Sequence, residues 1–309
     1  MLKIILTGGS GFLGSHLLEH MAFSDALVIG RTRPTHCRNF RSLSFDASTS
    51  FTELIDGFDV VVHTAGRAHI MKEECNNPLD EYRKINTLVT LNLAKQAAQA
   101  GIKRFIFISS IKVLGESTDL DVPFINSDGL NPQDPYSVSK AEAEVGLKKI
   151  AEASGMDLVI IRPPLIYGKG VKGNFLSLMK LATLPLPLPL GDIKNRRSLV
   201  SAENLVDLIV TCIEHPNARN KSFLVSDDRD VTTPELFSML SVTGGFTPWI
   251  FRCPQILLSF CLSLLGKSAI FDRLCSSMQV NIDYTKSELS WYPPSKIESS
   301  LAKCWSKVN

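Results

Sequence analysis

An apolar strand, a glycine-rich loop and a helix open the chain, and this order constrains the fold more than any other stretch of the sequence. Residues 3–6 form a short apolar run, typical of a parallel strand buried on both faces. The loop TGGSGFLG follows at positions 7–14, and residues 15–23 have a helical pattern. Such a unit binds a pyrophosphate through the amide groups at the start of its helix. The sequence therefore predicts a nucleotide-binding site at this loop.

The glycines of the loop have separate expected roles. Gly8 permits a tight turn, Gly11 lets the backbone approach a pyrophosphate, and Gly14 allows the helix to pack closely on the strand. The spacing is GxxGxxG, and the alternative interpretation is a glycine-rich turn without a ligand. We expect the cofactor to contact this loop at Gly8, Ser10, Gly11, Phe12, Leu13 and Gly14.

Strands and helices alternate along the rest of the first half. Strands are predicted at residues 26–30, 43–45, 59–63, 103–108 and 157–161, and long helices at 78–100 and 137–153. This alternation predicts an α/β fold of the Rossmann type, a doubly wound parallel sheet that binds its ligand at the carboxyl ends of the strands. His63 continues a strand and is expected to be a core residue rather than a base. Further cofactor contacts are expected at this edge from Asp46, Ala47, Thr64, Ala65, Gly66, Ser109 and Pro163.

The residues after the second strand indicate which dinucleotide is bound. In this fold an acidic residue about 20 positions past the glycines binds the ribose 2′-hydroxyl of NAD, whereas an arginine suits the 2′-phosphate of NADP. The chain has Arg31 at this position, with Arg33 close by and no acidic residue. The sequence therefore favours NADP(H), with NAD(H) as the alternative. The competing interpretation is that both arginines are solvated loop residues.

Charge and cysteine content exclude several classes of function. The 309 residues carry a formal net charge of +2 with lysine and arginine spread along the chain, so nucleic acid is not an expected partner. Seven cysteines at irregular spacing match neither a disulfide framework nor a zinc site, and no metal is expected. The cysteine pattern and the lack of a signal-peptide pattern favour a cytoplasmic protein.

The most apolar segment is residues 256–265, bracketed by Arg252 and Lys267. It is too short for a membrane span, which needs about 20 apolar residues. We expect a packed helix here, with a helix lying on a membrane surface as the less favoured interpretation. The alternating prolines of residues 184–190 predict an extended connector.

Tyr136 and Lys140 are the strongest catalytic candidates. They are four residues apart at the start of a helical segment, and such positions share one face of a helix. A phenol has an ordinary pKa of about 10, and an ammonium group together with a positively charged nicotinamide favours the phenolate. Tyr136 is therefore predicted to exchange a proton near neutral pH. The YxxxK pattern also arises by chance on helix surfaces, so its weight here depends on the nucleotide-binding loop in the same chain.

These motifs together resemble the extended short-chain dehydrogenases/reductases, in particular the NAD-dependent epimerase/dehydratase family. The matching segments span nearly the full length: TGGSGFLG (7–14), VVHTAG (61–66), FISSIKVLGE (107–116), YSVSK (136–140) and RPPLIYG (162–168). The resemblance implies that Ser110 hydrogen-bonds the sugar oxygen, Tyr136 exchanges its proton, and Lys140 holds the nicotinamide ribose. Ser109 is the competing choice for the serine role.

The resemblance also implies a substrate and an assembly. A UDP-sugar is expected to contact Ser110, Tyr136, Asn174, Arg197 and Arg273, with Arg197 on the β-phosphate. Family members often form homodimers through the helix that carries YxxxK and the helix before it. We expect a dinucleotide domain over residues 1–165, completed by about 198–226. Residues 166–197 and 227–309 are expected to form a smaller mixed substrate domain.

Within the family, the chain is most similar to a bacterial branch that acts on UDP-N-acetylhexosamines in surface-polysaccharide (O-antigen) assembly. This branch includes UDP-N-acetylquinovosamine dehydrogenases, which reduce UDP-4-keto-6-deoxy-N-acetylglucosamine, and UDP-glucose 4-epimerase-like proteins. Arg31 favours the 4-keto reductase, because an enzyme that exchanges NADPH at each turnover has a use for a 2′-phosphate site. The alternatives are a 4-epimerase with bound NAD and a non-catalytic NADP-sensing protein. Leu165 and Lys112 depart from the epimerase pattern, where an asparagine and a small hydroxyl residue are common.

Overall fold

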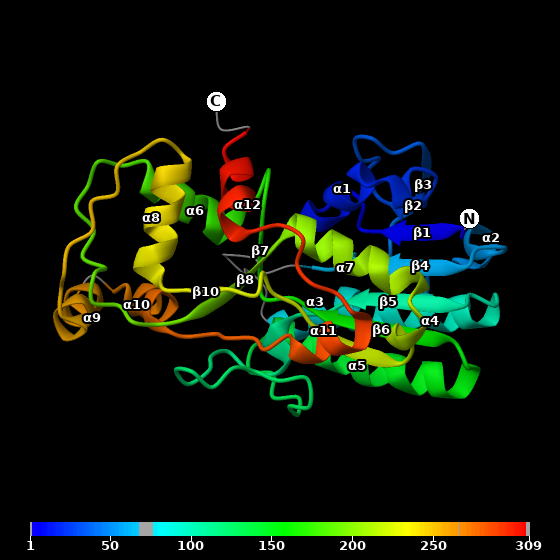
Figure 1. The fold of residues 1–309 in the computed structure, drawn as a ribbon. Helices are drawn as coiled ribbons and strands as arrows, with labels where there is room; N and C mark the ends of the chain where they lie inside the picture. Colours follow the sequence, from blue (N-terminus) through cyan, green and yellow to red (C-terminus); the bar gives the residue numbers. More distant parts are fainter. Residues whose placement is uncertain (1, 68–76, 265, 307–309) are drawn as a thin grey trace.

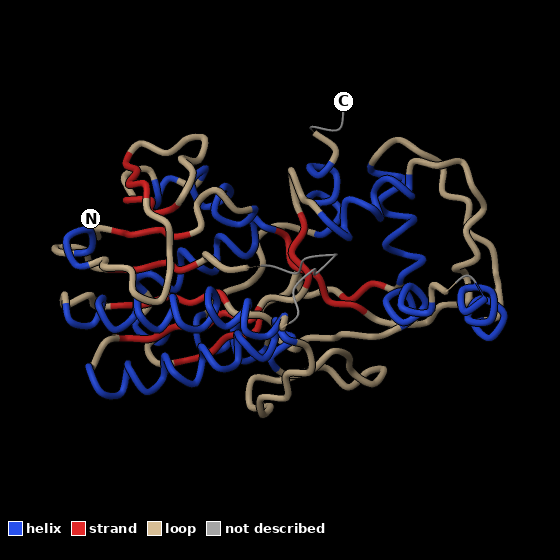
Figure 2. The backbone as a smooth tube through the Cα atoms, turned by 180° about the vertical axis from the view of Figure 1, so that it is seen from behind, coloured by secondary structure: helices blue, strands red, loops and turns tan. Residues whose placement is uncertain are grey.

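The computed structural model describes residues 2–67, 77–264 and 266–306, apart from the side chains of Asn174 and Ala269. A large sheet flanked by helices occupies one end of the molecule, and a smaller, mainly helical part occupies the other (Figure 1). Seen from behind, the small sheet lies on the side of the smaller part that is nearest the large sheet (Figure 2).

The large sheet has seven strands in the order β3-β2-β1-β4-β5-β6-β9, and every neighbouring pair is parallel. Its central strands are buried on both faces, as continuous apolar runs require. This confirms the predicted Rossmann-type α/β fold. In sequence order, the strands are β1 (Ile4–Thr7), β2 (Leu27–Gly30), β3 (Asn39–Ser42), β4 (Val60–His63), β5 (Arg104–Ile108), β6 (Asp157–Arg162) and β9 (Lys221–Leu224).

Alternate strand residues face opposite sides of the sheet, and both sides are apolar, so helices cover both faces. Ile4 and Leu6 pack under α1 and α7, whereas Ile5 packs under α4 and α5. The helices around the sheet are α1 (Phe12–Glu19), α2 (Thr52–Ile55), α3 (Pro78–Tyr82), α4 (Thr90–Gln99), α5 (Pro135–Ser154), α7 (Ala202–Glu214) and α11 (Asp283–Leu289). The π-helical segment η2 (Arg83–Val89) joins α3 to α4, and short 3-10 turns follow α1 (η1, Met21–Phe23), β5 (η3, Ile111–Val113) and α7 (η4, Pro216–Ala218).

Two predicted elements differ from the structure. The third strand is Asn39–Ser42 rather than residues 43–45. It lies at the sheet edge with mostly exposed side chains, so it has no apolar pattern, while Leu43 and Phe45 pack against the core from the loop after it. The first helix begins at Phe12, directly after its N-cap Gly11, rather than at residue 15.

The smaller part contains a three-stranded sheet in the order β10-β8-β7, and a separate apolar core. Asp227 ties the two sheets together: its carboxylate accepts hydrogen bonds from the Tyr167 hydroxyl at 2.7 Å and from the Ser201 amide at 2.9 Å. The elements are β7 (Leu165–Tyr167), α6 (Gly173–Ala182), β8 (Arg197–Ser201), β10 (Asp230–Val231), α8 (Thr233–Thr243), α9 (Gln255–Leu264), α10 (Ser268–Cys275) and α12 (Ile297–Cys304). The division into two domains stays a prediction.

The apolar segment near residue 256 forms α9 at the far end of the smaller part (Figure 1). Leu258 is buried, but Ile256, Phe260 and Leu264 are exposed, so only one side of this helix is packed. Within the described ranges, no helix combines the length and apolar character that crossing a bilayer requires.

A buried ion pair anchors α5 to β6. Arg162 donates from Nη2 to the Glu144 carboxylate at 2.7 Å and from Nε at 3.1 Å, and both side chains are almost completely inaccessible. Removing one member of such a pair leaves the other charge desolvated, which costs more than the pair contributes.

We expect Arg162→Met to lower the free energy of unfolding by about 3–5 kcal/mol, because Glu144 then stays charged without a partner. Urea denaturation measures this change. Arg162→Met combined with Glu144→Leu should recover most of the loss, since no buried charge remains. Equal instability of the single and double variants would contradict this account.

Candidate active site

The carboxyl ends of β1, β4, β5 and β6 lie level with one another at one edge of the sheet. In the parallel register Thr7 pairs with His63, His63 with Phe107 and Phe107 with Ile160. The loops that follow these strands therefore start side by side. They carry Gly8, Thr64, Ser109 and Pro163, as the sequence predicts for a ligand-binding edge.

The glycine loop is built by close backbone contacts. Gly8 has φ of 80°, and a Cβ there would lie 2.5 Å from the Ala65 amide nitrogen. A Cβ on Gly14 would lie 2.2 Å from the Gly8 carbonyl oxygen, so α1 packs directly on the loop. Neither position accepts a side chain. These contacts match the turn and packing roles expected for Gly8 and Gly14.

The start of α1 presents backbone rather than side chains. Gly11 is its N-cap, with no capping side chain and no acidic residue in the first turn. Leu13 is buried in the sheet core, and Phe12 packs edge to face on His16 with ring centroids 5.0 Å apart. Leu13 can therefore contact a cofactor only through its amide, whereas Phe12 is half-buried and Ser10 is exposed on the loop.

The predicted adenosine end is more open. Arg31 is exposed immediately after β2. The Asp46 carboxylate accepts hydrogen bonds from the Ser48 amide and hydroxyl, both at 2.8 Å, and these bonds lower its pKa. The carboxylate is thus used in a local turn, and the Asp46 amide is used there too, since it donates to the Thr49 hydroxyl at 2.8 Å.

Several predicted contacts at the edge form part of the scaffold. Thr64 donates from its hydroxyl to the Thr7 carbonyl at 2.7 Å, and the Pro163 carbonyl accepts the Ile111 amide at 2.9 Å. Ser109 is buried, and its hydroxyl has no hydrogen-bond partner among the described residues. An orphaned polar group at a ligand edge is a candidate ligand contact.

His63 is a core residue, as expected. Its Nδ1 shares a hydrogen bond with the Thr7 hydroxyl at 2.6 Å, and its Nε2 shares one with the Thr90 hydroxyl at 2.9 Å. Burial lowers the pKa of His63 to about 3, so the ring is neutral at physiological pH.

Ser110 and Tyr136 are brought together, although 26 positions separate them in the chain. Ser110 caps η3, with its hydroxyl accepting the Lys112 amide at 3.3 Å. Tyr136 lies in the first turn of α5 and packs edge to face on Tyr82, with ring centroids 5.9 Å apart. A hydrogen bond between Ser110 and the Tyr136 phenol completes the pair.

The electrostatics of Tyr136 differ from the expectation. Burial and then the Asp134 carboxylate raise the pKa of Tyr136 to about 12, and the hydrogen bond with Ser110 acts in the opposite direction. The protein's own groups thus raise this pKa rather than lowering it. Burial is the main cause of the raised pKa, and Lys140 does not offset it, because its ammonium group donates to the Ile108 carbonyl at 2.9 Å.

Lys140 is buried beneath the site. Its Nζ lies 4.5 Å from the centroid of the Phe107 ring. Burial lowers the pKa of Lys140 to about 8, while the charge of Glu144, one turn further along α5, opposes this shift. Lys140 therefore keeps a positive charge at neutral pH in a poorly solvated position, where charge acts strongly.

The π-helical segment η2 supplies one polar residue that sequence reasoning missed. Asn86 is buried and donates to the Ser139 hydroxyl at 3.0 Å, while its carbonyl oxygen accepts the Arg67 amide at 2.7 Å. It therefore joins α5 to the loop after β4. The sequence offered no signal for this role, because the segment also carries Arg83, Lys84 and Thr87, and only the folded chain shows which of the polar residues are buried in the π-helical turn.

Asp134 is a second residue that sequence reasoning missed. One carboxylate oxygen accepts the Ser137 amide at 2.6 Å and caps α5, and the other accepts Lys112 Nζ at 2.7 Å. Lys112 also pairs with Glu116 at 2.8 Å. The cap could have been read from the sequence, because Asp before Pro at the first helical position is a common helix start. The ion pair could not.

The predicted substrate residues lie in the smaller part. Arg197 begins β8 and donates from Nε to the Ser276 carbonyl at 3.0 Å and from Nη2 to the Ser276 hydroxyl at 2.7 Å. Arg273 is exposed on α10, three positions before Ser276. The side chain of Asn174, at the start of α6, lies outside the described residues.

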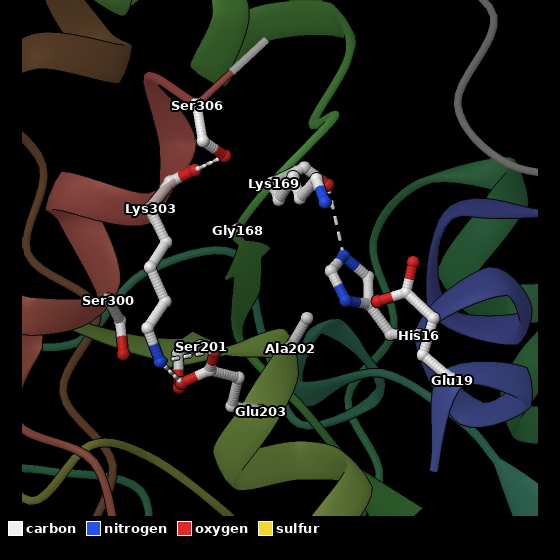
Figure 3. Close-up of a pocket in the computed structure, with 10 residues that line it drawn as sticks. All are labelled: His16, Glu19, Gly168, Lys169, Ser201, Ala202, Glu203, Ser300, Lys303 and Ser306. Atoms are coloured by element: carbon white, nitrogen blue, oxygen red, sulfur yellow. Dashed lines mark hydrogen bonds and ion pairs between the residues drawn. The ribbon is translucent and has the colours of Figure 1, made fainter.

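A separate cavity of about 270 Å³ lies between α1, α7 and α12 and contains none of the catalytic candidates (Figure 3). Two of its polar lining contacts are internal to the protein: Lys303 Nζ lies 2.7 Å from a Glu203 carboxylate oxygen, and His16 Nε2 lies 3.0 Å from the Lys169 carbonyl. The open space near the first helix is therefore distinct from the cluster around Tyr136.

We expect Asp134→Asn to lower the pKa of Tyr136 below about 12, because a neutral amide no longer disfavours the phenolate. Asparagine caps a helix as well as aspartate does, so α5 should stay intact. Phenolate absorbance during a pH titration, compared with the same titration of Tyr136→Phe, reports this group. Asp119→Asn, at an exposed position, is the control. An unchanged or higher pKa in Asp134→Asn would contradict the assignment.

Comparisons with known proteins agree with this architecture. The model of the NAD dependent epimerase/dehydratase family matches residues 4–226. A UDP-glucose 4-epimerase from Vibrio cholerae is 46% identical over 307 residues, which cover 97% of this chain and 93% of that protein.

Solved structures show the same fold. UDP-glucuronic acid 4-epimerase from Bacillus cereus, in complex with NAD, has a TM-score of 0.76 at 20% identity over 98% of this chain and 97% of that chain. RMD from Pseudomonas aeruginosa, complexed with NADPH, has a TM-score of 0.74 at 22% identity over 99% and 98%. The family model and the Vibrio cholerae relative each span most of the sequence. The chain therefore belongs to the NAD dependent epimerase/dehydratase family and is an enzyme of the nucleotide-sugar epimerase and dehydrogenase kind.

Proposed function

We propose that this enzyme is an NAD-dependent 4-epimerase of a UDP-hexose. The observation that carries the proposal is the cluster of Ser110, Tyr136 and Lys140 at the carboxyl edge, next to the glycine loop. The name of the Vibrio cholerae relative, UDP-glucose 4-epimerase, supports this reaction over nearly the whole chain. The epimerase, an alternative on sequence grounds alone, is therefore preferred to the 4-keto reductase.

The chain's own residues fit a dinucleotide. The uncapped start of α1 offers amide donors and a favourable dipole to a pyrophosphate. A Cβ on Gly66 would lie 3.4 Å from Lys140 Nζ, so a side chain there would fill the space above the lysine. Ser109 offers a buried hydroxyl without a partner in the described part of the chain. Together these groups would hold the cofactor from the pyrophosphate to the nicotinamide end.

A bound NAD would supply the hydride chemistry at C4 of the sugar. The protein's part is to move a proton and to hold the charge on oxygen. Tyr136 must be ionised to accept the proton of the 4-hydroxyl group, and it later returns that proton. Burial and Asp134 disfavour the phenolate, whereas the positive charge that a bound nicotinamide would supply favours it. The Ser110 hydroxyl donates a hydrogen bond to the same oxygen as negative charge develops. Lys140 contributes positive charge from a buried position.

The substrate diphosphate suits the arginines of the smaller part. Arg197 and Arg273 both lie close to the segment around Ser276, Arg197 by direct hydrogen bonds. A guanidinium group binds two phosphate oxygens at once and stays charged when partly buried. We assign the β-phosphate to Arg197, with Arg273 and Asn174 as further substrate contacts.

The second candidate is the 4-keto reductase acting on UDP-4-keto-6-deoxy-N-acetylglucosamine. The observation that favours it is Arg31, which is exposed directly after β2, where an arginine can bind the 2′-phosphate of NADP. Surface-polysaccharide assembly would use the product of either reaction.

The test uses purified protein and product analysis. An epimerase interconverts UDP-glucose and UDP-galactose, or their N-acetylated counterparts, with NAD and no net change in its absorbance. The second candidate would instead consume NADPH with the 4-keto sugar and leave the UDP-hexoses unchanged. Cofactor binding with neither reaction would support the third alternative, a non-catalytic NADP-sensing protein.

We expect Tyr136→Phe to reduce kcat by about 10²–10⁴-fold with little change in KM, because the substituted ring cannot exchange a proton. Steady-state kinetics of the interconversion measure this effect, and Tyr292→Phe at an exposed position is the matched control. Retention of full activity by Tyr136→Phe would remove Tyr136 from the mechanism.

We expect Arg31→Ala to weaken NADP⁺ binding about tenfold while NAD⁺ binding stays nearly constant, because only NADP carries the 2′-phosphate. Calorimetric titration with both cofactors measures the difference. Arg38→Ala, which removes another exposed guanidinium near the same strands, is the control. Equal loss for both cofactors would show that Arg31 acts on the fold rather than on the phosphate.

The enzyme is also proposed to be a homodimer that pairs through the helical face around η2, α4 and α5. Leu88 and Val145 are exposed apolar residues on these elements, 47% and 43% accessible respectively. Single exposed apolar residues are ordinary on a protein surface, so the proposal rests on the family resemblance, and these two residues only mark where the contact would lie.

A further inference from the structure

Lys112 occupies a bridging position next to the proposed catalytic pair. It follows Ser110 by two residues, in η3, and its Nζ reaches across to Asp134 at 2.7 Å. Asp134 is the N-cap of α5 and precedes Tyr136 by two residues. One ion pair thus joins the segment that carries the serine to the helix that carries the tyrosine.

The bridge is held from both sides. Glu116 Oε2 lies 2.8 Å from Lys112 Nζ, so the ammonium group is fixed between two carboxylates. The second oxygen of Asp134 is committed to the Ser137 amide, so the carboxylate cannot move without breaking the helix cap. The backbone amide of Lys112 donates to the Ser110 hydroxyl, which orients that hydroxyl.

The geometry points to Lys112 as a positioning residue that fixes the Ser110 hydroxyl relative to the Tyr136 phenol. The inference rests on the proposed 4-epimerase function, in which both groups act on one sugar oxygen. Displacing two groups that share one oxygen lowers catalysis steeply, because the hydrogen bonds must form together in the transition state.

The fold of this region does not depend on the bridge alone. The Asn131 amide donates to the Val113 carbonyl at 2.8 Å, and the Ile111 amide donates to the Pro163 carbonyl at 2.9 Å. Lys112 and Asp134 are both partly exposed, so water can solvate either group after its partner is removed. Variants at Lys112 should therefore fold.

The test is a double-mutant cycle between Lys112 and Asp134. Lys112→Met removes the ammonium group, Asp134→Asn keeps the helix cap but removes the charge, and Lys112→Arg keeps the bridge. We expect Lys112→Met to lower kcat about tenfold with KM nearly unchanged, and Lys112→Arg to recover most of the loss. In the Asp134→Asn background the same substitution should have little further effect.

Independent effects of Lys112→Met and Asp134→Asn on kcat would overturn the proposal, because Lys112 would then act by its own charge rather than through Asp134. Full activity of Lys112→Met would also overturn it. Lys103→Met, at the opposite end of β5 in an exposed ion pair with Asp59, is the matched control.

A measurement that needs no substrate tests the role of Lys112 independently of the proposed 4-epimerase function. The groups that face the Tyr136 phenol are Asp134, Ser110 and Tyr82, and Lys112 reaches the phenol through Asp134. The pH titration of the Tyr136 phenolate, measured by absorbance against Tyr136→Phe, should shift upward in Lys112→Met and return in Lys112→Arg. If no UDP-sugar is converted, the function fails while this shift still tests the bridge. If the phenolate titration does not move, the bridge fails whatever the reaction.

An independent observation concerns the far end of the smaller part. The outer apolar face consists of one side of α9 and the preceding loop, namely Trp249, Phe251, Ile256, Leu257, Phe260 and Leu264. Ile256 is 86% exposed, Leu264 71%, and both Trp249 and Phe260 60%. A helix on a protein surface ordinarily turns polar residues outward. Here the outward stripe Ile256, Phe260 and Leu264 is wholly apolar.

The charges around the outer apolar face indicate what kind of partner could cover it. The sequence has no acidic residue from 244 to 271, whereas Arg252 and Lys267 are both exposed at its borders. A groove of about 530 Å³ runs beside the face, between α9 and Phe271. A twofold pairing of this face with a second copy would bring like charges together. Exposed tryptophan beside a cationic border instead suits the interface of a membrane.

We propose that the outer apolar face docks on the surface of a bilayer that contains anionic phospholipid. Ile256, Phe260 and Leu264 would enter the boundary between headgroups and acyl chains, with Trp249 at headgroup level. Arg252 and Lys267 would contact the phosphate groups. α9 has ten residues and lies along the surface in this arrangement rather than crossing it.

Vesicle co-sedimentation tests this docking with the full chain. We expect binding to vesicles of phosphatidylcholine mixed with phosphatidylglycerol, and weaker binding to vesicles of phosphatidylcholine alone. Binding to the mixture should be about tenfold weaker after Ile256→Ser combined with Phe260→Ser. Arg252→Gln should weaken the binding to the anionic mixture only. Val122→Ser, at an exposed apolar residue on a distant loop, is the control.

Absence of binding to either kind of vesicle would overturn the proposal. Concentration-dependent self-association that is lost in the Ile256→Ser, Phe260→Ser variant would assign the face to a second copy instead, and would overturn it too. A blue shift of tryptophan emission on binding that is lost in Trp249→Phe would support insertion at the predicted face, since this variant keeps the other two tryptophans, buried Trp291 and half-buried Trp305.

Discussion

The parallel register of the central strands is the constraint on which the site depends. Thr7, His63, Phe107 and Ile160 form one row across β1, β4, β5 and β6. The loops that follow β1, β4 and β5, which carry Gly8, Thr64 and Ser109, therefore leave the sheet at the same level. A shift of one residue in any pair would turn buried side chains to the opposite face, so the apolar core itself holds this alignment.

Buried polar groups then connect the sheet edge to α5. Lys140 reaches the Ile108 carbonyl, Asn86 reaches Ser139, and Glu144 pairs with Arg162. Each of these groups would be costly to bury alone, so each contact restricts where α5 can lie. The helix that carries Tyr136 is consequently fixed along its length, at its cap, at its middle turns and against β6.

The electrostatic state of the site follows from this burial. In the protein's own field the Tyr136 phenol is harder to ionise and the Lys140 ammonium is easier to neutralise than in water. Both shifts have the same cause, the removal of water from a charged form. Asp134, the N-cap of α5, and Lys112, in η3, carry opposite charges only 2.7 Å apart. These charges act in opposite directions on the pKa of Tyr136.

The sequence by itself determined the elements whose signals are local. The glycine spacing indicated the turn at Gly8 and the close packing at Gly14, and the four-residue spacing of Tyr136 and Lys140 placed both on α5. Apolar runs identified the buried strands, but edge strand β3 had no such run and was placed too late in the chain. Tertiary structure decided what depends on partners distant in sequence. It directed Lys140 to Ile108 instead of Tyr136, joined Lys112 to Asp134, and placed Arg197 against Ser276. Local patterns report which face a residue occupies, whereas pKa values and ion pairs depend on groups that only the folded chain brings within a few ångströms.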